Sequence, residues 1–405
     1  MRILHISTRL ILGGSQENTV LSCEGQAALG HEVHLAYGPI YGPEGSLFDR
    51  AANFRTRDGG GIGMHEVPNM VRQIDPRHDA KCMGQLRKLI RELRPDIVHT
   101  HSSKAGVIGR AAAWAEGGRR PRGAGQQAIG VVHTIHGPPF HERQNPLVKW
   151  MYVLAERYAA KRCHLIVGVA DSMTEQFLAA GIGKREQYST VYSGMEVERY
   201  LHPDEGQSRA EMRAGLGLRE DDFVIGSVAR LAELKGHDDI LDALGDELRA
   251  NANWKLLWVG DGWWRERLLA RVESMGLRDR VITTGLVPSE RVPGHMRAMD
   301  VMVHASYREG LPRTVPQALL CGTPVVATDV DGTREACIEG KTGKLVRLGD
   351  IGGLRAAVRW MFDHPAERRG LAEFGREMCR ERFSAATMVR ELEEVYARAL
   401  AMAKA

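Results

Sequence analysis

Short apolar runs alternate with longer stretches of helical periodicity through the first half of the chain. The apolar runs, each predicted to be a buried strand, lie at residues 3–7, 32–37, 96–99, 129–135 and 165–169. Between them, apolar residues recur every three or four positions and predict helices at residues 17–29, 81–94, 147–160 and 173–180. Residues 101–104 are predicted to open one more helix with a serine cap, and residues 38–80 to be irregular. Strand–helix repeats of this kind predict a parallel sheet covered by helices on both faces.

The alternation starts again at residue 223, after a polar stretch at residues 195–222. Further strands are predicted at residues 223–228, 255–259, 281–285, 301–305 and 324–328. Helices are predicted at residues 237–249, 263–275 and 313–321, and the chain after residue 348 is mostly helical. A chain of 405 residues exceeds the usual size of one domain. We therefore predict an α/β protein with two doubly wound, Rossmann-like domains that face a cleft.

The loop after residues 301–305 carries Glu309, Gly310 and Pro312, and the next helix begins near Arg313. In parallel α/β sheets, ligands bind at loops that leave the carboxyl end of a strand and enter a helix. The first amide groups of that helix lack partners within the helix, so they favour an anion such as a diphosphate. Glu309, just before the turn, is placed to accept hydrogen bonds from hydroxyl groups beside the anion. The loop therefore suits a phosphorylated polyol, although an ordinary strand–helix unit with a solvated glutamate has the same local pattern.

Two cations follow the first predicted strand of the second series. Arg230 and Lys235 stand five residues apart at the carboxyl end of that strand. Arginine offers a planar fork and lysine a point charge, and together they can neutralise a diphosphate. Two exposed cations without a ligand are the alternative.

Further candidates lie at other predicted strand ends. His136 begins a Gly-Pro-Pro loop, where an imidazole could bind a sugar hydroxyl, move a proton or simply pack. His99, His101 and His133 are near it in sequence but do not have the spacing of a metal site. The paired glycines Gly13 and Gly14 would let the backbone approach a phosphate or a sugar, although the dinucleotide-binding glycine pattern is missing. Asp329 and Asp331 form the DxD motif of metal-dependent sugar transferases. A motif of three residues often occurs by chance, so no metal site is predicted.

Composition narrows the class of protein. Hydrophobic residues make up 43% and charged residues 26% of the chain, as in globular proteins with an ample core. No apolar run is long enough to span a membrane, and the first residues enter a strand directly instead of forming a secretory signal. The six cysteines are scattered and form no CxxC pair, so we expect a reducing, cytoplasmic compartment and no structural zinc.

Positive charge is concentrated in the first half of the chain. Residues 1–200 contain 25 Lys and Arg against 19 Asp and Glu, a balance of +6, while the remainder has a balance of −2. Basic residues cluster at positions 81–94 and 119–122. Such a surface could meet an anionic membrane or a phosphorylated lipid, or it could be an ordinary solvated helix face. No basic platform interleaved with aromatic residues is present, so nucleic-acid binding is not expected.

Several stretches together resemble retaining glycosyltransferase family 4, whose fold is GT-B. They include Gly13-Gly14, His136-Gly137, SGMEVERY at residues 193–200, and ARLAELKG with Arg230 and Lys235. GDGWWRERL, VITTGLVPSERV, residues 308–331 and GKTGKLVRLGD complete the resemblance, which covers nearly the whole chain. HSSKAGVIGR is similar to a stretch in family members that build bacterial surface polysaccharides or lipid-linked oligosaccharides.

The resemblance implies an acceptor-binding domain at residues 1–195 and a donor-binding domain at residues 196–380. A last helix at residues 381–405 would cross back onto the first domain. The donor would be a nucleotide-diphosphate sugar, with UDP favoured over GDP, and the acceptor a glycan or a polyprenyl-linked sugar at the cytoplasmic face of the membrane. No cofactor or metal is implied, because arginine and lysine supply the charge on the leaving diphosphate.

The resemblance also assigns residues to roles. Arg230 and Lys235 would bind the diphosphate, Glu309 the donor-sugar hydroxyls, and Gly14 the donor phosphates, while His136 would lie near the reacting centre. The donor-binding turn would comprise Gly310, Leu311, Pro312, Arg313, Thr314 and Val315.

One position departs from the family motif. Its second glutamate, which accepts hydrogen bonds from the ribose, is Gln317 here. Glutamine keeps an acceptor oxygen but loses the charge, at an expected loss on the order of 1 kcal/mol in donor binding. This departure leaves two alternatives to an ordinary transferase: a weakened or non-catalytic member that binds nucleotide sugar, and a nucleotide-sugar epimerase.

Overall fold

The computed structural model describes residues 1–41, 45–119, 127–141 and 144–405. The chain forms two compact units, and each is considered by itself. The N-terminal unit contains Met1–Met195 together with Ala385–Ala405, and the C-terminal unit contains Glu196–Ser384. Positions 120–122 of the basic cluster lie outside the described residues. No helix among the described residues is both long and apolar enough to cross a membrane.

The N-terminal unit is built on a seven-stranded parallel sheet with the order β3-β2-β1-β4-β5-β6-β7. The strands are β1 (Arg2–Ser7), β2 (Glu32–Tyr37), β3 (Ile62–Glu66), β4 (Ile97–His101), β5 (Gly130–Ile135), β6 (Leu165–Gly168) and β7 (Tyr188–Thr190). The predicted strands are present, and β4 runs two residues further than expected. The edge strands β3 and β7 were not predicted, because each is short and contains polar residues.

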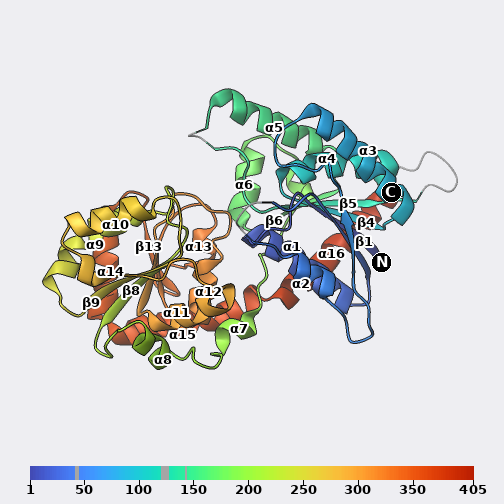
Figure 1. Cartoon of the computed structure of the whole chain (residues 1–405). Coiled ribbons are helices and arrows are strands. Elements are labelled where there is room, and N and C mark those ends of the chain that lie inside the picture. The colour runs from blue at the N-terminus through green and yellow to red at the C-terminus, as the bar shows by residue number, and fades with distance from the viewer. Residues whose placement is uncertain (42–44, 120–126, 142–143) are drawn as a thin grey trace. The chain divides into compact units, whose positions relative to one another are not determined.

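Helices cover both faces of this sheet (Figure 1). The helices α3 (Pro76–Leu93), α4 (Ser103–Ala113) and α5 (Pro146–Ala160) lie on one face. The helices α1 (Gly14–Ala28) and α16 (Ala385–Lys404) lie on the other face, with α2 (Phe48–Asn53) beyond them. A short π-helical turn, η1 (Trp114–Gly118), follows α4, and α6 (Asp171–Ala179) and η2 (Arg185–Gln187) follow β6.

Three details differ from the prediction. Residues 38–80 are not irregular throughout, since they contain α2, β3 and the beginning of α3. The start of α3 is marked by Asp75, whose carboxylate caps it, and by the proline that follows. Ser102 does not cap α4, because its backbone has a φ of 63° and its hydroxyl lies 2.7 Å from the Thr8 hydroxyl.

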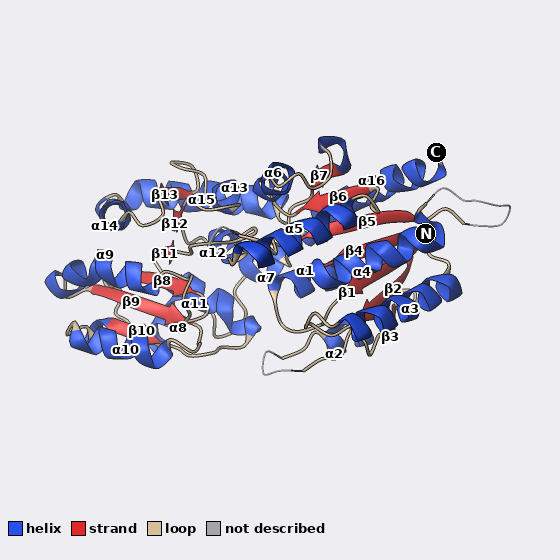
Figure 2. Cartoon of the chain, turned by 90° about the horizontal axis from the view of Figure 1, so that it is seen from above, coloured by secondary structure: helices blue, strands red, loops and turns tan. Residues whose placement is uncertain are grey.

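The C-terminal unit repeats the design with a six-stranded parallel sheet in the order β10-β9-β8-β11-β12-β13. The strands are β8 (Phe223–Val228), β9 (Trp254–Val259), β10 (Val281–Thr283), β11 (Val301–His304), β12 (Val325–Thr328) and β13 (Gly343–Val346). Viewed from above, the strands follow one another across the unit in this order (Figure 2). Together the two units give the GT-B fold class that the sequence predicts.

The helices of this unit also form two layers. One layer contains α9 (His237–Ala250), α10 (Arg265–Ser274) and α14 (Ile351–Asp363). The other contains α8 (Arg209–Gly215), α11 (Val292–Ala298), α12 (Thr314–Leu320) and α15 (Pro365–Arg382). The remaining short helices are α7 (Val197–Leu201), η3 (Arg278–Arg280), η4 (Ser289–Arg291) and α13 (Thr333–Ala336).

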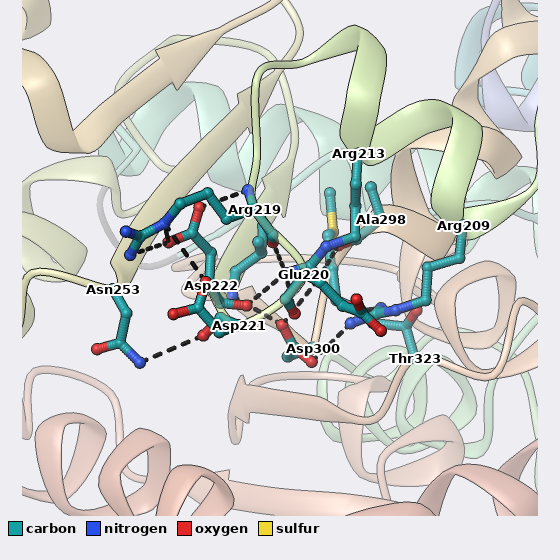
Figure 3. Close-up of polar contacts among 12 residues, drawn as sticks. Arg209, Arg213, Arg219, Glu220, Asp221, Asp222, Asn253, Ala298, Asp300 and Thr323 are labelled. Atoms are coloured by element: carbon teal, nitrogen blue, oxygen red, sulfur yellow. Dashed lines mark hydrogen bonds and ion pairs between the residues drawn. The ribbon is translucent and has the colours of Figure 1, made fainter.

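Guanidinium groups of α8 fix the polar segment that precedes β8 (Figure 3). Arg213 of α8 donates hydrogen bonds to the Ala298 carbonyl at 3.1 Å and to the Asp300 carboxylate at 3.2 Å. Asp300 also accepts from Arg209 at 2.7 Å and from the backbone N–H of Val224 at 2.8 Å. These contacts hold α8 at the amino ends of β8 and β11. The candidate site lies at the opposite, carboxyl edge of the same sheet.

Candidate active site

The candidate site of the C-terminal unit lies at the carboxyl ends of β8 and β11, where the strand order reverses. Polar ligands bind at such points because loops that leave neighbouring strands diverge there. The two loops touch at Gly236, which has a φ of +68°. A β-carbon at this position would lie 2.0 Å from the Ala305 carbonyl oxygen, so only glycine fits. Gly236 therefore sets the spacing between the loop that carries Lys235 and the loop that carries Glu309.

Lys235 and Glu309 form an ion pair across these two loops. The Lys235 Nζ atom lies 2.7 Å from Glu309 Oε1, and the His304 Nε2 atom lies 3.3 Å from the same oxygen. Burial raises the pKa of the Glu309 carboxyl, but His304 and the Lys235 ammonium outweigh it and hold that pKa well below its ordinary value. Glu309 is therefore an ionised acceptor at neutral pH, next to a cation.

The backbone of Glu309 is held by the loop after β12. Asp331, at a φ of 46°, accepts a hydrogen bond from the Glu309 backbone N–H at 2.7 Å. Asp329 makes two bonds to the Arg334 guanidinium, at 2.9 and 2.6 Å. Both carboxylates of the DxD sequence thus have partners within the protein, and one of them positions Glu309.

Arg230 is exposed in the loop after β8. Its guanidinium carbon lies 5.5 Å from the ring centre of Trp263, which follows β9 and is itself exposed. Among the described residues Arg230 has no carboxylate partner, in contrast to Lys235. Its charge is therefore available to an anionic ligand.

The start of α12 supplies the remaining predicted residues of this unit. Leu311 and Val315 are buried, and the Val315 N–H already donates to the Pro312 carbonyl at 3.1 Å. The Gly310 carbonyl accepts from the Gly332 N–H at 3.1 Å, which joins this turn to the loop after β12. Pro312 has no N–H, so it cannot donate to an anion bound at this turn.

Gln317 lies within α12 and is 8% exposed. Its backbone takes part in the helix, since its N–H donates to the Arg313 carbonyl at 3.2 Å. Its side-chain amide makes no hydrogen bond to any other residue that the structure describes. A buried amide of this kind is open to a ligand.

Gly14 and His136 lie at the carboxyl edge of the N-terminal sheet. Gly14 is the first residue of α1, and Gly13 before it is extended, with a φ of −178°. His136 follows β5, and its Nε2 atom lies 3.1 Å from Nδ1 of His101. These two residues belong to a different unit from Arg230, Lys235, Glu309 and Gln317.

Sequence reasoning missed the partners of these residues. His304 and Asp331, which hold Glu309, stand at the end of β11 and after β12, and the spacing along the chain does not reveal their contact. His99 and His101 alternate along β4 and so share one face, and the register pairs His5 of β1 with His99. That alternation is the one signal that could have indicated a buried histidine cluster.

Comparison with known proteins settles the family. Residues 13–194 match the family described as "Glycosyl transferase 4-like domain", and residues 208–378 match "Glycosyl transferases group 1". The chain is 30% identical, over 313 residues, to the 2-deoxystreptamine N-acetyl-D-glucosaminyltransferase of Streptomyces fradiae. That match covers 75% of this chain and 72% of the relative. The chain belongs to the family 4 glycosyltransferases.

Two further comparisons place this glycosyltransferase among its relatives. It is 29% identical over 298 residues to the Escherichia coli UDP-Gal:alpha-D-GlcNAc-diphosphoundecaprenol alpha-1,3-galactosyltransferase, covering 72% of this chain and 73% of that protein. The solved structure of Anabaena Alr3699/HepE in complex with UDP matches with a TM-score of 0.77 at 20% identity, covering 98% of this chain and all of the other. The structural match shows the shared GT-B fold.

Proposed function

We propose that this glycosyltransferase is a retaining, metal-independent hexosyltransferase that uses a nucleotide-diphosphate sugar. The observation that carries the proposal is the Lys235–Glu309 pair at 2.7 Å. It places a cation and an ionised acceptor side by side, as the phosphate and the hydroxyls of a sugar 1-phosphate would require. Arg230 and Lys235 would neutralise the leaving diphosphate, and Glu309 would bind hydroxyls of the transferred sugar.

The other candidate residues have supporting roles in this proposal. Gln317 would accept a hydrogen bond from the ribose through its amide oxygen, and the turn from Gly310 to Val315 would hold the phosphates and the sugar. Gly14 and His136 would approach the donor from the N-terminal unit, which would also bind the acceptor. Because cationic side chains supply the charge, activity should survive EDTA. Loss of activity that Mg²⁺ or Mn²⁺ restores would contradict this proposal.

We favour UDP over GDP as the nucleotide. The E. coli relative is named for UDP-Gal, whereas a Mycolicibacterium smegmatis relative, 27% identical, is named for GDP-mannose. A panel of UDP-, GDP- and ADP-sugars read by thermal shift would decide, because a bound donor raises stability by RT ln(1 + [L]/Kd). Stabilisation by GDP-sugars alone would overturn the preference for UDP. Analysis of the anomeric configuration of the product would test retention.

The acceptor in this proposal is a glycan or a polyprenyl-linked sugar used in cell-surface polysaccharide synthesis. The diphosphoundecaprenol acceptor in the name of the E. coli relative supports a lipid-linked substrate. A lipid-linked acceptor would bring the enzyme to the cytoplasmic face of a membrane. The exposed side chains of helix α5 support such an approach.

Exposed apolar side chains follow one face of α5. Leu147 is 75% and Trp150 is 62% exposed, and Leu154 and Tyr158 continue the stripe at helical spacing. Cations accompany it at Lys149, Arg157 and Lys161, whereas the single acidic residue of the helix, Glu156, is buried against Arg110 at 2.6 Å. An apolar stripe with basic residues on the same helix fits the surface of an anionic bilayer.

Vesicle binding tests this surface directly. The protein should bind vesicles that contain anionic lipid more tightly than neutral vesicles, and added salt should weaken the binding. Trp150→Ser should reduce binding about tenfold, since it removes one inserted aromatic side chain. Phe374→Ser, which removes an exposed aromatic residue from α15 of the other unit, is the matched control and should have no effect. Equal binding to neutral and anionic vesicles at low salt would contradict the proposal.

Two other functions remain distinguishable by experiment. A non-catalytic member would show donor stabilisation but no transfer to any polyprenyl or glycan acceptor, and Gln317 is the residue that favours it. An epimerase would convert the nucleotide sugar without any acceptor. Transfer of radiolabelled sugar to a polyprenyl-diphosphate acceptor would exclude both.

A further inference from the structure

A chain of hydrogen bonds leads from His136 into the interior of the N-terminal unit. His136 Nε2 lies 3.1 Å from His101 Nδ1, and His101 Nε2 lies 2.9 Å from His5 Nδ1. His5 Nε2 then lies 2.7 Å from Oε1 of Gln26 in α1. His5 and Gln26 are fully buried and His101 nearly so.

The Gln26 amide is oriented by a second branch that ends on β5. Its Nε2 atom donates to the Tyr396 hydroxyl of α16 at 2.8 Å. The Tyr396 hydroxyl lies 2.6 Å from His99 Nδ1, and His99 Nε2 lies 2.7 Å from the Thr134 hydroxyl. With Nε2 of Gln26 directed at tyrosine, Oε1 faces His5.

With Oε1 of Gln26 facing His5, these contacts allow only one arrangement of protons in neutral rings. The Gln26 oxygen can only accept, so His5 carries its proton on Nε2 and accepts at Nδ1. His101 must then donate from Nε2 and accept at Nδ1, which places the proton of His136 on Nε2. Each ring thus fixes the tautomer of the next one toward the surface.

Burial keeps the inner rings neutral. It lowers the pKa of His5 to about 4, against a smaller opposing effect of the hydrogen bond to Gln26. Burial, reinforced by the neighbouring histidines, also lowers the pKa of His99 and His101 well below the ordinary value. A neutral imidazole has one donor and one acceptor, which is the condition that the chain of hydrogen bonds needs.

We propose that His101, His5 and Gln26 are positioning residues that hold the His136 imidazole in its Nε2–H tautomer. His136 would then present Nδ1 as a hydrogen-bond acceptor to a hydroxyl group of the substrate. This inference rests on the proposed role of His136 in sugar binding. It also gives the buried histidines a role other than metal binding. Although ring nitrogens of His5, His99 and His101 come within 4.8 Å of one another, all six nitrogens of these rings take part in hydrogen bonds.

The first test measures the tautomers in the full-length protein. Long-range ¹H–¹⁵N correlation spectra of histidine-labelled protein distinguish Nε2–H from Nδ1–H rings, and the loss of one set of signals in His136→Gln assigns that residue. We expect His136, His101 and His5 to be Nε2–H tautomers. A His136 ring that is Nδ1–H, or a mixture of both forms, would overturn the proposal.

The second test reverses the chain of hydrogen bonds from its remote end. In Gln26→Glu, the new carboxylate favours a protonated His5, whose Nδ1–H would donate to His101. His101 and then His136 should switch to the Nδ1–H form, and kcat should fall roughly tenfold or more, as wrong-tautomer variants of catalytic histidines do. Retention of the Nε2–H form of His136 in a folded Gln26→Glu protein would overturn the proposal. If Gln26→Glu does not fold, Gln26→Met takes its place. It removes the oxygen that accepts from His5 without adding charge, so His136 should then show a mixture of both tautomers.

A third test compares two substitutions of His101. In His101→Asn the amide oxygen can take the place of Nδ1 and accept from His136, whereas His101→Phe offers no acceptor. We expect Asn to retain most of kcat and Phe to lose about tenfold, with the donor KM changed less than kcat in both. Equal losses in two folded variants would overturn the positioning role. If His136→Ala keeps full activity while the tautomers are fixed as expected, the proposed function of His136 fails and the hydrogen-bond chain stands.

Discussion

The two sheets share a strand order around their centre but place polar residues differently. In the N-terminal unit, buried polar side chains lie within the strands themselves, among them His5, His99, His101, His133 and Thr134. In the C-terminal unit, β8, β11 and β12 are almost entirely apolar, and the charged groups stand in the loops that follow them. In the N-terminal unit, polar side chains within the strands contact residues at the surface. In the C-terminal unit, the charged residues of the candidate site lie on loops that follow apolar strands.

Because of this difference, we expect protonation to affect the stability of the N-terminal unit and ligand binding by the C-terminal unit. A polar group inside a sheet must satisfy its hydrogen bonds within the protein, so its ionisation state is tied to folding. A charged group on a loop keeps contact with water and can exchange its protein partner for a ligand. The predictions below separate these two cases.

Acid should unfold the N-terminal unit first. The pKa of His5 is lowered from about 6.5 to about 4, so below pH 6.5 the unfolded chain binds a proton that the folded one does not. The free energy of unfolding therefore has its full value above pH 6.5 and decreases as the pH falls toward 4. The decrease is on the order of 3 kcal/mol for His5 alone. His99, His101 and His133 add to it in the same direction.

Hydrogen exchange resolved by peptide, corrected for the intrinsic effect of pH, checks this prediction. Between pH 7 and 5, protection of β1, β4 and β5 should fall well before that of β8, β11 and β12. Simultaneous loss in the two units would show that the histidines within the strands do not control acid stability.

Removal of the loop cation should damage catalysis without affecting the sheet. Lys235→Ala, and likewise Arg230→Ala, should lower kcat/KM by about a hundredfold or more, because uncompensated charge on the leaving group raises the barrier. Lys344→Ala is the matched control, since Lys344 also pairs with a glutamate, Glu339 at 3.2 Å, but stands on the edge strand β13. Its kcat/KM should stay within about twofold of wild type. Near-normal activity of both Arg230→Ala and Lys235→Ala would show that the diphosphate is bound elsewhere.

A smaller effect is expected at Gln317. Gln317→Leu, of similar length but without an acceptor, should raise the donor KM about tenfold. Gln317→Glu should remain active, and Glu309→Gln should lower kcat as well as affinity because it weakens contacts to the reacting sugar. An unchanged KM in Gln317→Leu, alongside an inactive Glu309→Gln, would make Gln317 a packing residue.

The smallest effect concerns a buried histidine of the C-terminal unit. His237 is 1% exposed, and neither of its ring nitrogens has a hydrogen-bond partner among the described residues. His237→Phe removes an unsatisfied polar group and should raise the free energy of unfolding by about 1 kcal/mol at pH 7, and by more at pH 5. His295→Phe is the contrasting control. It should destabilise the protein, since His295 lies 2.7 Å from the Arg291 carbonyl.

The sequence predicted most of the fold because both sheets are parallel and their central strands are continuous apolar runs. It missed β3, β7 and β13, where short edge strands carry polar residues, and it placed a serine cap at Ser102 where the hydroxyl instead contacts Thr8. It also predicted the loops that carry Lys235 and Glu309, since a strand followed by polar residues and a helix is a local pattern. The contact between the two loops, however, depends on the strand order.

The histidine network could not be predicted for a physical reason. Gln26, His5, His101 and Tyr396 come from four separate elements, and their contact depends on strand register and on the return of α16. In the linear sequence only the alternation of His99 and His101 is visible, and nothing there links these residues to Gln26 or Tyr396. A parallel sheet brings them together only after it has formed.

Helix α16 is the last helix to be synthesised but packs in the N-terminal unit, so that unit cannot finish folding until α16 has been made. Its residues Leu392, Val395, Tyr396 and Ala399 cover Ile3, Ile97, Val132 and Leu165 of the N-terminal sheet. At ribosomal rates of roughly 5–20 residues per second, residues 196–384 take on the order of ten to forty seconds to emerge before α16 follows. During that interval the first unit to leave the ribosome has an uncovered apolar face and the second unit can already close. The twenty residues of α16 therefore complete the first domain, so a nascent chain that stalls before them would depend on chaperones to remain soluble.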